Sequence, residues 1–314
     1  MLREFRRADA PRFFQLMAAN FPEEGALLEY RAEAFEAVVR RLYRPDVRFL
    51  LRLLDALRHP VVRFFTLDVD GALAGTAILT FSEGAGFVST VMVDDRYRRQ
   101  GYAKKLMQAC QDVARRAGRR YLVLDVLSDN HGARSLYDGL GFLALRRQSY
   151  FSLELAQAAA PSEVENPPGI RPMRRRDGPA LVHLAISQSP ALVQQVLPTR
   201  RRDFFVPAIV VRGLESETTA WVVDRGQGVE GFVRATDSSA TQAGHVTVPL
   251  LAPSVPPELA SALLECAIGW VARRDHRKVV ASAARDNVNG VRTLEARGFR
   301  EAIPMETLYR PIAG

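Results

Sequence analysis

One short segment of the chain combines residue types that suit the binding of a phosphate group. A β-branched apolar run ends at Val93, a turn follows, and a helical pattern of apolar residues begins at Ala103. The first amides of a helix have no partner inside it, and the helix dipole adds positive partial charge at that end. A strand, a tight turn and a helix start in this order therefore predict an anion site.

The residues of the turn support this prediction. Gly101 and the small Ala103 allow a close approach of the backbone to a ligand. The segment also carries positive charge suited to a pyrophosphate, on Arg98, Arg99, Lys104 and Lys105. For Arg99 and Lys105 an ordinary solvated charge is an open alternative, and Arg98 is the stronger candidate.

A second group of candidate residues follows the next predicted strand, Tyr121–Leu127. A short helix there has one apolar face with Ala133, Leu136 and Tyr137. Tyr137 can act as a proton donor or simply fill the core. Asn130, just before this helix, can bind a ligand or cap the helix. The residues alone leave both alternatives open.

Together the two groups resemble the sequence signature of the GCN5-related N-acetyltransferase (GNAT) superfamily. Arg98, Gly101 and Ala103 fit its Q/R-x-x-G-x-G/A loop. Asn130, Ala133, Tyr137 and Gly141-Phe142 fit its N-x-x-A-x-x-x-Y…GF segment. The resemblance covers residues 2–155 in order.

The resemblance implies acetyl-CoA as co-substrate, direct attack by an amine, and no metal. In this family the central strand splays from its neighbour, and the pantetheine arm lies in the gap. An amide near Val93 would polarise the thioester, Tyr137 would protonate the leaving thiolate, and Asn130 would face the cleft. The residues that the resemblance assigns to acetyl-CoA are Met92, Val93, Arg98, Arg99, Gln100, Gly101, Tyr102, Ala103, Lys104 and Asn130.

The general base is not identified by the sequence. Many family members place an acidic residue on the central strand, but Ser89 and Thr90 occupy the corresponding positions here and cannot ionise for this purpose. Four carboxylates could act instead through a water molecule, namely Glu24, Glu33, Glu83 and Asp125. Nothing in the sequence selects among them.

The chain contains an internal repeat. Arg3–Pro11 aligns with Arg171–Pro179 without a gap, and Asp129–Phe142 aligns with Asp286–Phe299. We therefore expect an α/β protein of two tandem GNAT-like domains, each with a mixed, mostly antiparallel central sheet flanked by helices. The expected domains are residues 1–155 and 170–314, joined by a small, polar, Pro-rich linker at 156–169.

The strands and helices of the first copy follow from local patterns. Asp70-Gly71 predicts a hairpin turn, and Gly118 ends the long helix. The expected strands are Val61–Val69, Ala72–Phe81, Gly86–Val93, Tyr121–Leu127 and a closing strand Tyr150–Leu155. Additional helical sequence between Phe21 and Arg58, with Phe35, Val38, Val39 and Leu42 on one face, could cover a site or simply add helix.

The second copy has lost the residues of the anion site. Its central strand is expected at Val246–Leu251, followed by Pro253, Pro256 and Pro257, which have no amide to offer. Glu258 aligns with Gly101, and Leu294 replaces Tyr137. We expect this copy to buttress the first, to complete the acceptor cleft or to mediate pairing between chains. A homodimer is therefore possible.

Composition narrows the class of protein. The chain has 314 residues, 47% hydrophobic residues and a formal charge of +8 spread along its length. The absence of a clustered basic stripe argues against nucleic acid, and no apolar run reaches the length of a membrane span. With no signal peptide and two unpaired helical cysteines, Cys110 and Cys266, we expect a cytoplasmic protein.

The sequence favours an acetyl-CoA-dependent N-acetyltransferase that acts on an amine, preferably that of a small molecule. A protein or peptide amine is the alternative acceptor, and a non-catalytic acyl-CoA sensor or scaffold is the alternative outside the enzymes.

Overall fold

The computed structural model describes residues 1–29, 44–47, 49, 61–155, 166–205, 216–226, 228–238 and 240–312. The candidate base Glu33, the predicted apolar face from Phe35 to Leu42 and most of the predicted linker lie outside these residues. Among the described residues, no helix is long and apolar enough to cross a membrane.

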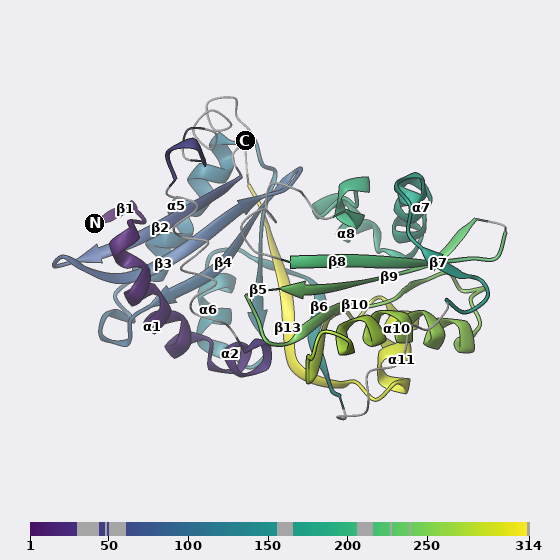
Figure 1. Ribbon diagram of the computed structural model, residues 1–314. Helices are drawn as coiled ribbons and strands as arrows, with labels where there is room; N and C mark the ends of the chain where they lie inside the picture. The colour runs from purple at the N-terminus through teal and green to yellow at the C-terminus, as the bar shows by residue number, and fades with distance from the viewer. Residues whose placement is uncertain are drawn as a thin grey trace.

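The first half follows the predicted order of elements (Figure 1). Its helices are η1 (Arg7–Asp9), α1 (Ala10–Asn20), α2 (Pro22–Leu28), η2 (Asp95–Tyr97), α5 (Tyr102–Arg116) and α6 (His131–Gly139). Its strands are β1 (Leu2–Glu4), β2 (Val62–Val69), β3 (Ala72–Phe81), β4 (Ala85–Val93), β5 (Tyr121–Leu127) and β6 (Leu143–Glu154).

The second half repeats this order. Its helices are η3 (Arg175–Asp177), α7 (Gly178–Gln188), α8 (Ala191–Val196), η4 (Arg201–Phe204), α10 (Pro257–Ala272) and α11 (Val288–Ala296). Its strands are β7 (Ile170–Pro172), β8 (Ser216–Asp224), β9 (Val229–Ser238), β10 (Gly244–Thr247), β11 (Leu250–Leu251), β12 (Lys278–Ala284) and β13 (Arg300–Pro311). The expected strand Val246–Leu251 is thus two short strands, because Val248 and Pro249 interrupt it.

The same ion-pair arrangement fixes the beginning of both halves. Arg3 donates to Asp9 at 2.7 Å and to Asp68 on β2 at 2.8 Å. In the second half Arg171 contacts Asp177 and Asp224, each at 2.8 Å. The first segments of the two halves therefore align without a gap because both form the same network of ion pairs.

The two halves form one continuous sheet. The strand order is β1-β2-β3-β4-β5-β13-β6-β12-β10-β9-β8-β7, with β11 paired to β9. The last strand of the second half, β13, lies between β5 and β6, and β6 pairs on its other side with β12. The expected last strand of the first half is present as β6, but it begins at Leu143 and pairs with two strands of the second half.

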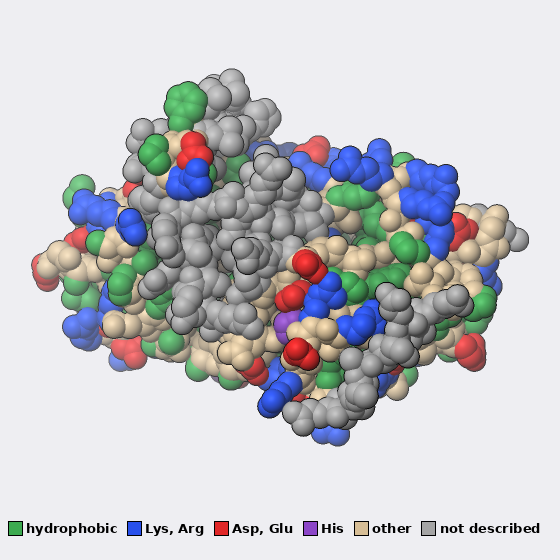
Figure 2. Space-filling view, in the orientation of Figure 1, with side chains coloured by type: hydrophobic (Ala, Val, Ile, Leu, Met, Phe, Trp, Pro, Cys, Tyr) green, Lys and Arg blue, Asp and Glu red, His purple; other side chains and the backbone are tan. Residues whose placement is uncertain are grey.

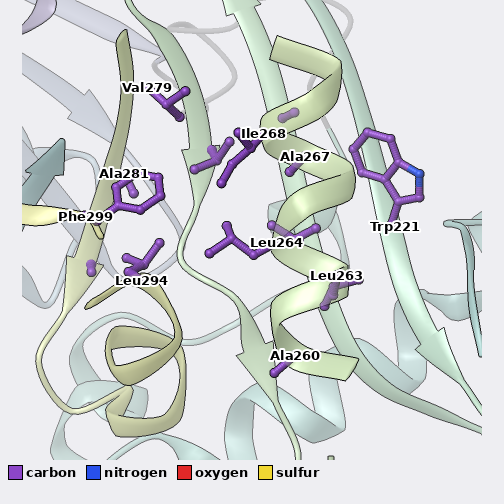
Figure 3. Close-up of a cluster of buried hydrophobic side chains, with 14 of the residues drawn as sticks. Trp221, Ala260, Leu263, Leu264, Ala267, Ile268, Val279, Ala281, Leu294 and Phe299 are labelled. Atoms are coloured by element: carbon purple, nitrogen blue, oxygen red, sulfur yellow. The ribbon is translucent and has the colours of Figure 1, made fainter. Parts of the chain in front are cut away.

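This exchange of strands joins the cores as well as the backbones. Leu308 of β13 is fully buried in the core of the first half, beside Tyr137. Phe151 of β6 is fully buried in the core of the second half, where α10 packs Leu264 and Ile268 toward β12 (Figure 3). Each half therefore needs the other to complete its hydrophobic core.

Helices cover both faces of the sheet near the predicted site. Phe13 of α1 is buried against Met92 and Leu73 on one face. Leu106 of α5 packs with Leu79 on the other. These two layers hold β4, the central strand of the first half, between them.

Candidate active site

The central strands of the first half separate at the predicted site. Parallel pairing of β4 with β5 runs from Ala85 to Val88, opposite Tyr121 to Leu124. Among the described residues, the ladder between these strands ends there. The remaining part of β4 and the end of β5 thus form the two sides of a cleft, as the resemblance implied.

A bulge in β4 accompanies this separation. The register with β3 shifts between Thr76↔Met92 and Ile78↔Ser89. Thr90 in the bulge has φ +48°, which is rare for a β-branched residue, and its buried hydroxyl has no hydrogen-bond partner among the described residues. Bulges bend a strand and are common beside active sites.

The backbone of Val93 faces the cleft. The amide of Asp94 donates to the carbonyl of Ala74 on β3 at 2.8 Å. Because successive residues of an antiparallel strand point their polar groups to opposite sides, Met92 also bonds to β3 and Val93 points away from it. The Val93 amide is therefore directed to the side on which β4 has left β5.

The turn after β4 presents the start of α5 to the same cleft. Arg99 and Gly101 have φ of +59° and +78°. Gly101 is the N-cap residue, no side chain caps the helix, and the first helical bond runs from the Lys105 amide to the Gly101 carbonyl at 3.1 Å. The amides of Tyr102, Ala103 and Lys104 therefore have no partner inside the helix.

A cavity of about 720 Å³ joins these features. Most of the acetyl-CoA residues expected from the sequence line it, namely Val93, Arg98, Arg99, Gly101, Tyr102, Ala103, Lys104 and Asn130, together with Tyr137. Met92 and Gln100 do not line it. The Met92 side chain is buried under α1, and the exposed Gln100 side chain donates to the Arg96 carbonyl.

Arg98 contributes to the shape of the turn. Its guanidinium donates to the Val93 carbonyl at 3.3 Å and to Asn20 Oδ1 at 3.0 Å, and it forms an ion pair with Asp95 at 2.7 Å. The positive charge of Arg98 is thus partly neutralised by Asp95. Arg99 and Lys104, which are exposed at the edge of the cavity, have more freedom to meet a phosphate.

Asp94 holds the turn in place. Its carboxylate caps η2 by accepting from the Arg96 amide at 3.0 Å, and it also binds the side chains of Arg96 and Arg12. The Arg96 guanidinium holds the pKa of this carboxyl far below its usual range. The contact with Arg12 is not predictable from local sequence patterns, because the two residues are far apart in the chain.

Tyr137 lines the cavity from α6. Its ring packs against Phe142 at 5.7 Å between centroids, and 6% of the residue is exposed. Burial raises the pKa of Tyr137 to about 12, so the hydroxyl keeps its proton at neutral pH. The residue is therefore a core tyrosine that also lines the cleft in its protonated form.

Asn130 caps α6, and its oxygen accepts from the Ala133 amide at 3.0 Å. The capping interpretation of the sequence is thus correct. Since the cap uses only the oxygen, the Nδ2 group of this exposed, cavity-lining side chain can still donate to a ligand.

Among the candidate bases that the structure describes, Glu24 is the one beside the cavity. Its neighbours Pro22 and Glu23 line the cavity, and so does Asp129, whose charge reaches it. Burial, helped by the charges of Glu23 and Asp129, raises the pKa of Glu24. Its Oε2 is buried without a hydrogen-bond partner among the described residues.

The other candidates have structural partners. Asp125 accepts a hydrogen bond from Thr307 of β13 at 2.6 Å, and burial raises its pKa. Glu83 forms an ion pair with Arg200 at 2.9 Å and lines a different cavity. Tyr150 lies near both Asp125 and Glu24, whose charges add to the effect of burial in raising its pKa.

Comparison with known proteins agrees with this geometry. The Acetyltransferase (GNAT) family matches residues 25–142. N-alpha-acetyltransferase 30 of Schizosaccharomyces pombe is 39% identical over 129 residues, which are 38% of this chain and 81% of that protein. The N-terminal acetyltransferase B complex catalytic subunit NAA20 of Arabidopsis thaliana is 40% identical over 63 residues, 20% of this chain and 36% of that protein.

The chain belongs to the GNAT acetyltransferase family.

Solved structures extend the likeness to the tandem fold of this GNAT protein. A tandem GNAT protein from the clavulanic acid biosynthesis pathway has a TM-score of 0.67 and 16% identity, and the match covers 100% of this chain and 99% of that one. A GCN5-related N-acetyltransferase from Sphaerobacter thermophilus has a TM-score of 0.64 and 17% identity, over 100% and 96% of the two chains. Membership in the family, with these N-alpha-acetyltransferase relatives, makes the chain an acetyl-CoA-dependent acyltransferase.

In the described part of the second GNAT half, the positions of the cleft are filled by direct contacts. Asn287, at the position of Asn130, donates its Nδ2 group to the Pro249 carbonyl at 3.0 Å and caps α11 at Gly290. A Cβ on Gly290 would lie 2.2 Å from the same carbonyl, so α11 is packed directly on the broken central strand. Pro256 and Pro257 begin α10, and Leu294 is fully buried at the position of Tyr137.

The second half instead holds α2, near the start of which Pro22 and Glu23 line the first cavity. Lys278 of β12 binds Glu29 at the end of α2 at 2.8 Å, and the Gln242 amide donates to the Glu29 carbonyl at 3.1 Å. Leu27 and Leu28 pack on side chains of the second half, including Met305 of β13. Among the described residues, no group of His, Cys, Asp and Glu is placed to hold a metal ion.

Proposed function

We propose that the first half transfers the acetyl group of acetyl-CoA to the free α-amino group of a peptide or protein. The observation that carries the proposal is the cleft between β4 and β5, which brings the inward amide of Val93, the hydroxyl of Tyr137 and the start of α5 to one cavity. Two relatives that are 39% and 40% identical over the matched residues are named as an N-alpha-acetyltransferase and an N-terminal acetyltransferase subunit.

The start of α5 suits the pyrophosphate of acetyl-CoA. The unpaired amides of Tyr102, Ala103 and Lys104 would donate to phosphate oxygens, and Gly101 leaves no Cβ in their path. Arg99 and Lys104 would add positive charge, while Arg98 would hold the turn against Val93 and Asn20. Met92 would serve only by fixing β4 to β3.

The chemical step follows from the groups around the cleft. The amine nitrogen attacks the thioester carbon while the Val93 amide donates to the carbonyl oxygen, where negative charge develops. Glu24 accepts a proton from the amine, directly or through a water molecule. As the carbon–sulfur bond breaks, Tyr137 donates its proton to the leaving sulfur.

Glu24 suits a base because of its surroundings. A carboxylate whose pKa is raised binds a proton more strongly, and that proton comes from an ammonium group that must lose it before attack. The nearby charge of Asp129 also favours a cationic acceptor at this position. Both features fit a free α-amine.

The small-molecule amine favoured by the sequence alone is the second candidate acceptor. The relatives named above give it no support, and the full-length matches at 16% and 17% identity show only the fold. The acceptor is therefore to be identified by measuring acetyl transfer to different amines side by side.

The test measures acetyl transfer from acetyl-CoA to three acceptors by mass spectrometry. These are a peptide with a free N-terminus, the same peptide with a formylated N-terminus and an internal lysine, and spermidine. We expect acetylation of the free α-amine at a kcat/KM at least about tenfold above the other two. Transfer to spermidine alone would establish the small-molecule acceptor. Binding of acetyl-CoA without transfer to any amine would establish a sensor or scaffold.

A further inference from the structure

A second cavity lies where the two halves meet. Its volume is about 690 Å³, within the range of sites for small molecules, and none of its lining residues lines the first cavity. The first half contributes the end of β3 at Phe81–Glu83 and Arg146 of β6. The second half contributes the segment from α8 to η4 and side chains of β8 and β9.

Positive charge dominates the lining of this cavity. Arg146, Arg200, Arg202 and Arg234 face it, together with the carboxylates of Glu83 and Asp203. Glu83 pairs with Arg200 at 2.9 Å and lies 3.9 Å from Arg202. The Asp203 carboxylate accepts from the Arg200 backbone amide at 2.7 Å. Both carboxylates are thus already engaged.

Neither Arg146 nor Arg234 forms an ion pair with a carboxylate among the described residues, although Asp125 lies near Arg146 and Asp203 near Arg234. Arg234 donates to the backbone carbonyl of Asp203 at 3.2 Å, and burial lowers its pKa. The Nε of Arg146 is buried without an acceptor, and its terminal NH₂ reaches only Gln148 Oε1, at 3.3 Å. A partly buried guanidinium without an ion-pair partner carries a desolvation cost, so these two side chains favour a further counter-charge in the cavity.

The surroundings add to this excess. Arg119 lies over the Phe81 ring at 5.7 Å, and burial together with the charge of Arg202 lowers its pKa. Figure 2 shows basic side chains gathered along the edge of the molecule above α7 and α8. A cavity lined with one sign of charge attracts ligands of the opposite sign.

We propose that this cavity binds a small organic anion whose phosphate or carboxylate group is held by Arg146 and Arg234. The planar guanidinium groups can each make paired hydrogen bonds to such a group. Phe81, Leu197 and Phe205 provide an apolar surface for the rest of the molecule. The site draws on both halves, which gives the second half a binding role apart from acetyl transfer.

The test is isothermal titration of inorganic phosphate and of citrate into the full chain carrying Gly101→Glu. This substitution removes the anion site at α5, so binding there cannot be mistaken for the second cavity. We expect one site per chain for at least one anion, and the stronger anion identifies a phosphoryl or carboxylate ligand. Absence of binding by both at about 10 mM would overturn the proposal.

Three variants locate the site. Arg146→Gln and Arg234→Gln should each weaken binding by about tenfold or more, because each removes charge-assisted hydrogen bonds to the ligand. Arg147→Gln is the matched control, since this exposed neighbour of Arg146 carries the same charge and does not line the cavity. Equal weakening by Arg147→Gln would show a general effect of charge and would refute the site.

A measurement without ligand separates binding from a structural role. If the two arginines await an anion, the Tm of Arg146→Gln and Arg234→Gln without anions should equal or exceed that of the parent chain. A clear fall in Tm for both variants would make these arginines structural and would overturn the proposal. Titration of acetyl-CoA into the chain without Gly101→Glu reports separately on the proposed function.

Discussion

At the scale of single residues, the surroundings of a side chain decide which proton it holds. Tyr137 is buried among apolar groups, so it stays protonated at neutral pH and is ready to donate. Glu24 is partly buried near other carboxylates, which favours its protonated form and makes it a stronger base. Burial thus serves both packing and chemistry at these two positions.

Substitution of Tyr137 by Phe tests the proton donor. We expect kcat to fall by about 10²-fold with the Kd of acetyl-CoA unchanged, because the ring still fills the core while the proton is lost. Kinetics with the peptide acceptor and titration of acetyl-CoA measure the two effects. Tyr309→Phe on β13, which contacts Tyr121 and does not line the cavity, is the control. Equal kcat in the parent chain and Tyr137→Phe would exclude this residue as the acid.

Substitution of Glu24 by Gln tests the base through pH dependence. The raised pKa means that the base is lost as pH falls through that pKa, so the parent rate should rise with pH across this range. In Glu24→Gln the rate should be at least about tenfold lower and this limb of the profile should vanish. Glu83→Gln, at a candidate that lines the other cavity, should leave the profile unchanged. If the rate of Glu24→Gln still rises with pH as it does in the parent chain, another group is responsible for that rise.

The same substitution should alter stability in a defined direction. A carboxyl whose folded pKa is raised above the unfolded value stabilises the fold below the unfolded pKa, and this contribution is lost as pH rises through the folded pKa. At pH 7 Glu24 is therefore a cost to the folded state, and Glu24→Gln should have a higher Tm there. The gain should shrink on acidification, which thermal unfolding at several pH values would show.

At the scale of elements, the β4–α5 connection decides which half can bind an anion. In the first half the turn ends at Gly101 and leaves the helix amides open. In the second half Pro257 and Glu258 begin the helix, and Asn287 bonds across to Pro249. The two halves thus share the scaffold and differ in the chemistry of one turn.

The variant Gly101→Glu gives the first half the residue that the second half has at the aligned position, Glu258. Titration of acetyl-CoA should show one site in the parent chain and none in the variant, because a carboxylate would occupy the phosphate position and the left-handed φ of +78° disfavours a side chain. Gly71→Glu in the β2–β3 turn, also at positive φ with open space around it, is the matched control. Two sites in the parent chain would mean that the second half binds acetyl-CoA as well.

At the scale of the whole molecule, the halves are joined by exchanged strands. Leu308 of the second half completes the core around Tyr137, and α2 is held by contacts to Lys278 and Gln242. The cavity of the first half therefore depends on the second half even though the second half lacks a cleft. Among the roles left open by the sequence, buttressing is the one these contacts support.

Cleavage between the halves tests this dependence. A protease site inserted within residues 156–165 should be cut without separating the fragments, because the exchanged strands stay paired and their buried side chains stay in place. The cut protein should elute as one species on size exclusion and keep its acetyltransferase activity. Residues 1–155 produced alone should not fold stably, since β5 and β6 lose the strand between them. Two separate folded fragments after cleavage would contradict the exchange.

Local interactions allowed much of this protein to be predicted from its sequence. The hairpin at Asp70-Gly71, the helix start after Gly101 and the cap at Asn130 depend on neighbouring residues, so their patterns are visible in the chain. The repeat and the loss of the site from the second half follow from the same local patterns. The family resemblance, which rests on these segments, is confirmed.

Tertiary structure alone decided which strand pairs with which and which candidate carboxylate lies beside the cleft. Strand β13 meets β5 with Met305 opposite Leu127, and β6 meets β12 with Gln148 opposite Ala284, at equivalent positions of the repeat. Because the halves are copies, the last strand of either fits either sheet, and local sequence cannot distinguish pairing within a half from exchange. The proposed role of Glu24 likewise depends on α2, which the second half holds beside the cleft. Such contacts join residues that are distant in the chain, so local sequence patterns do not predict them.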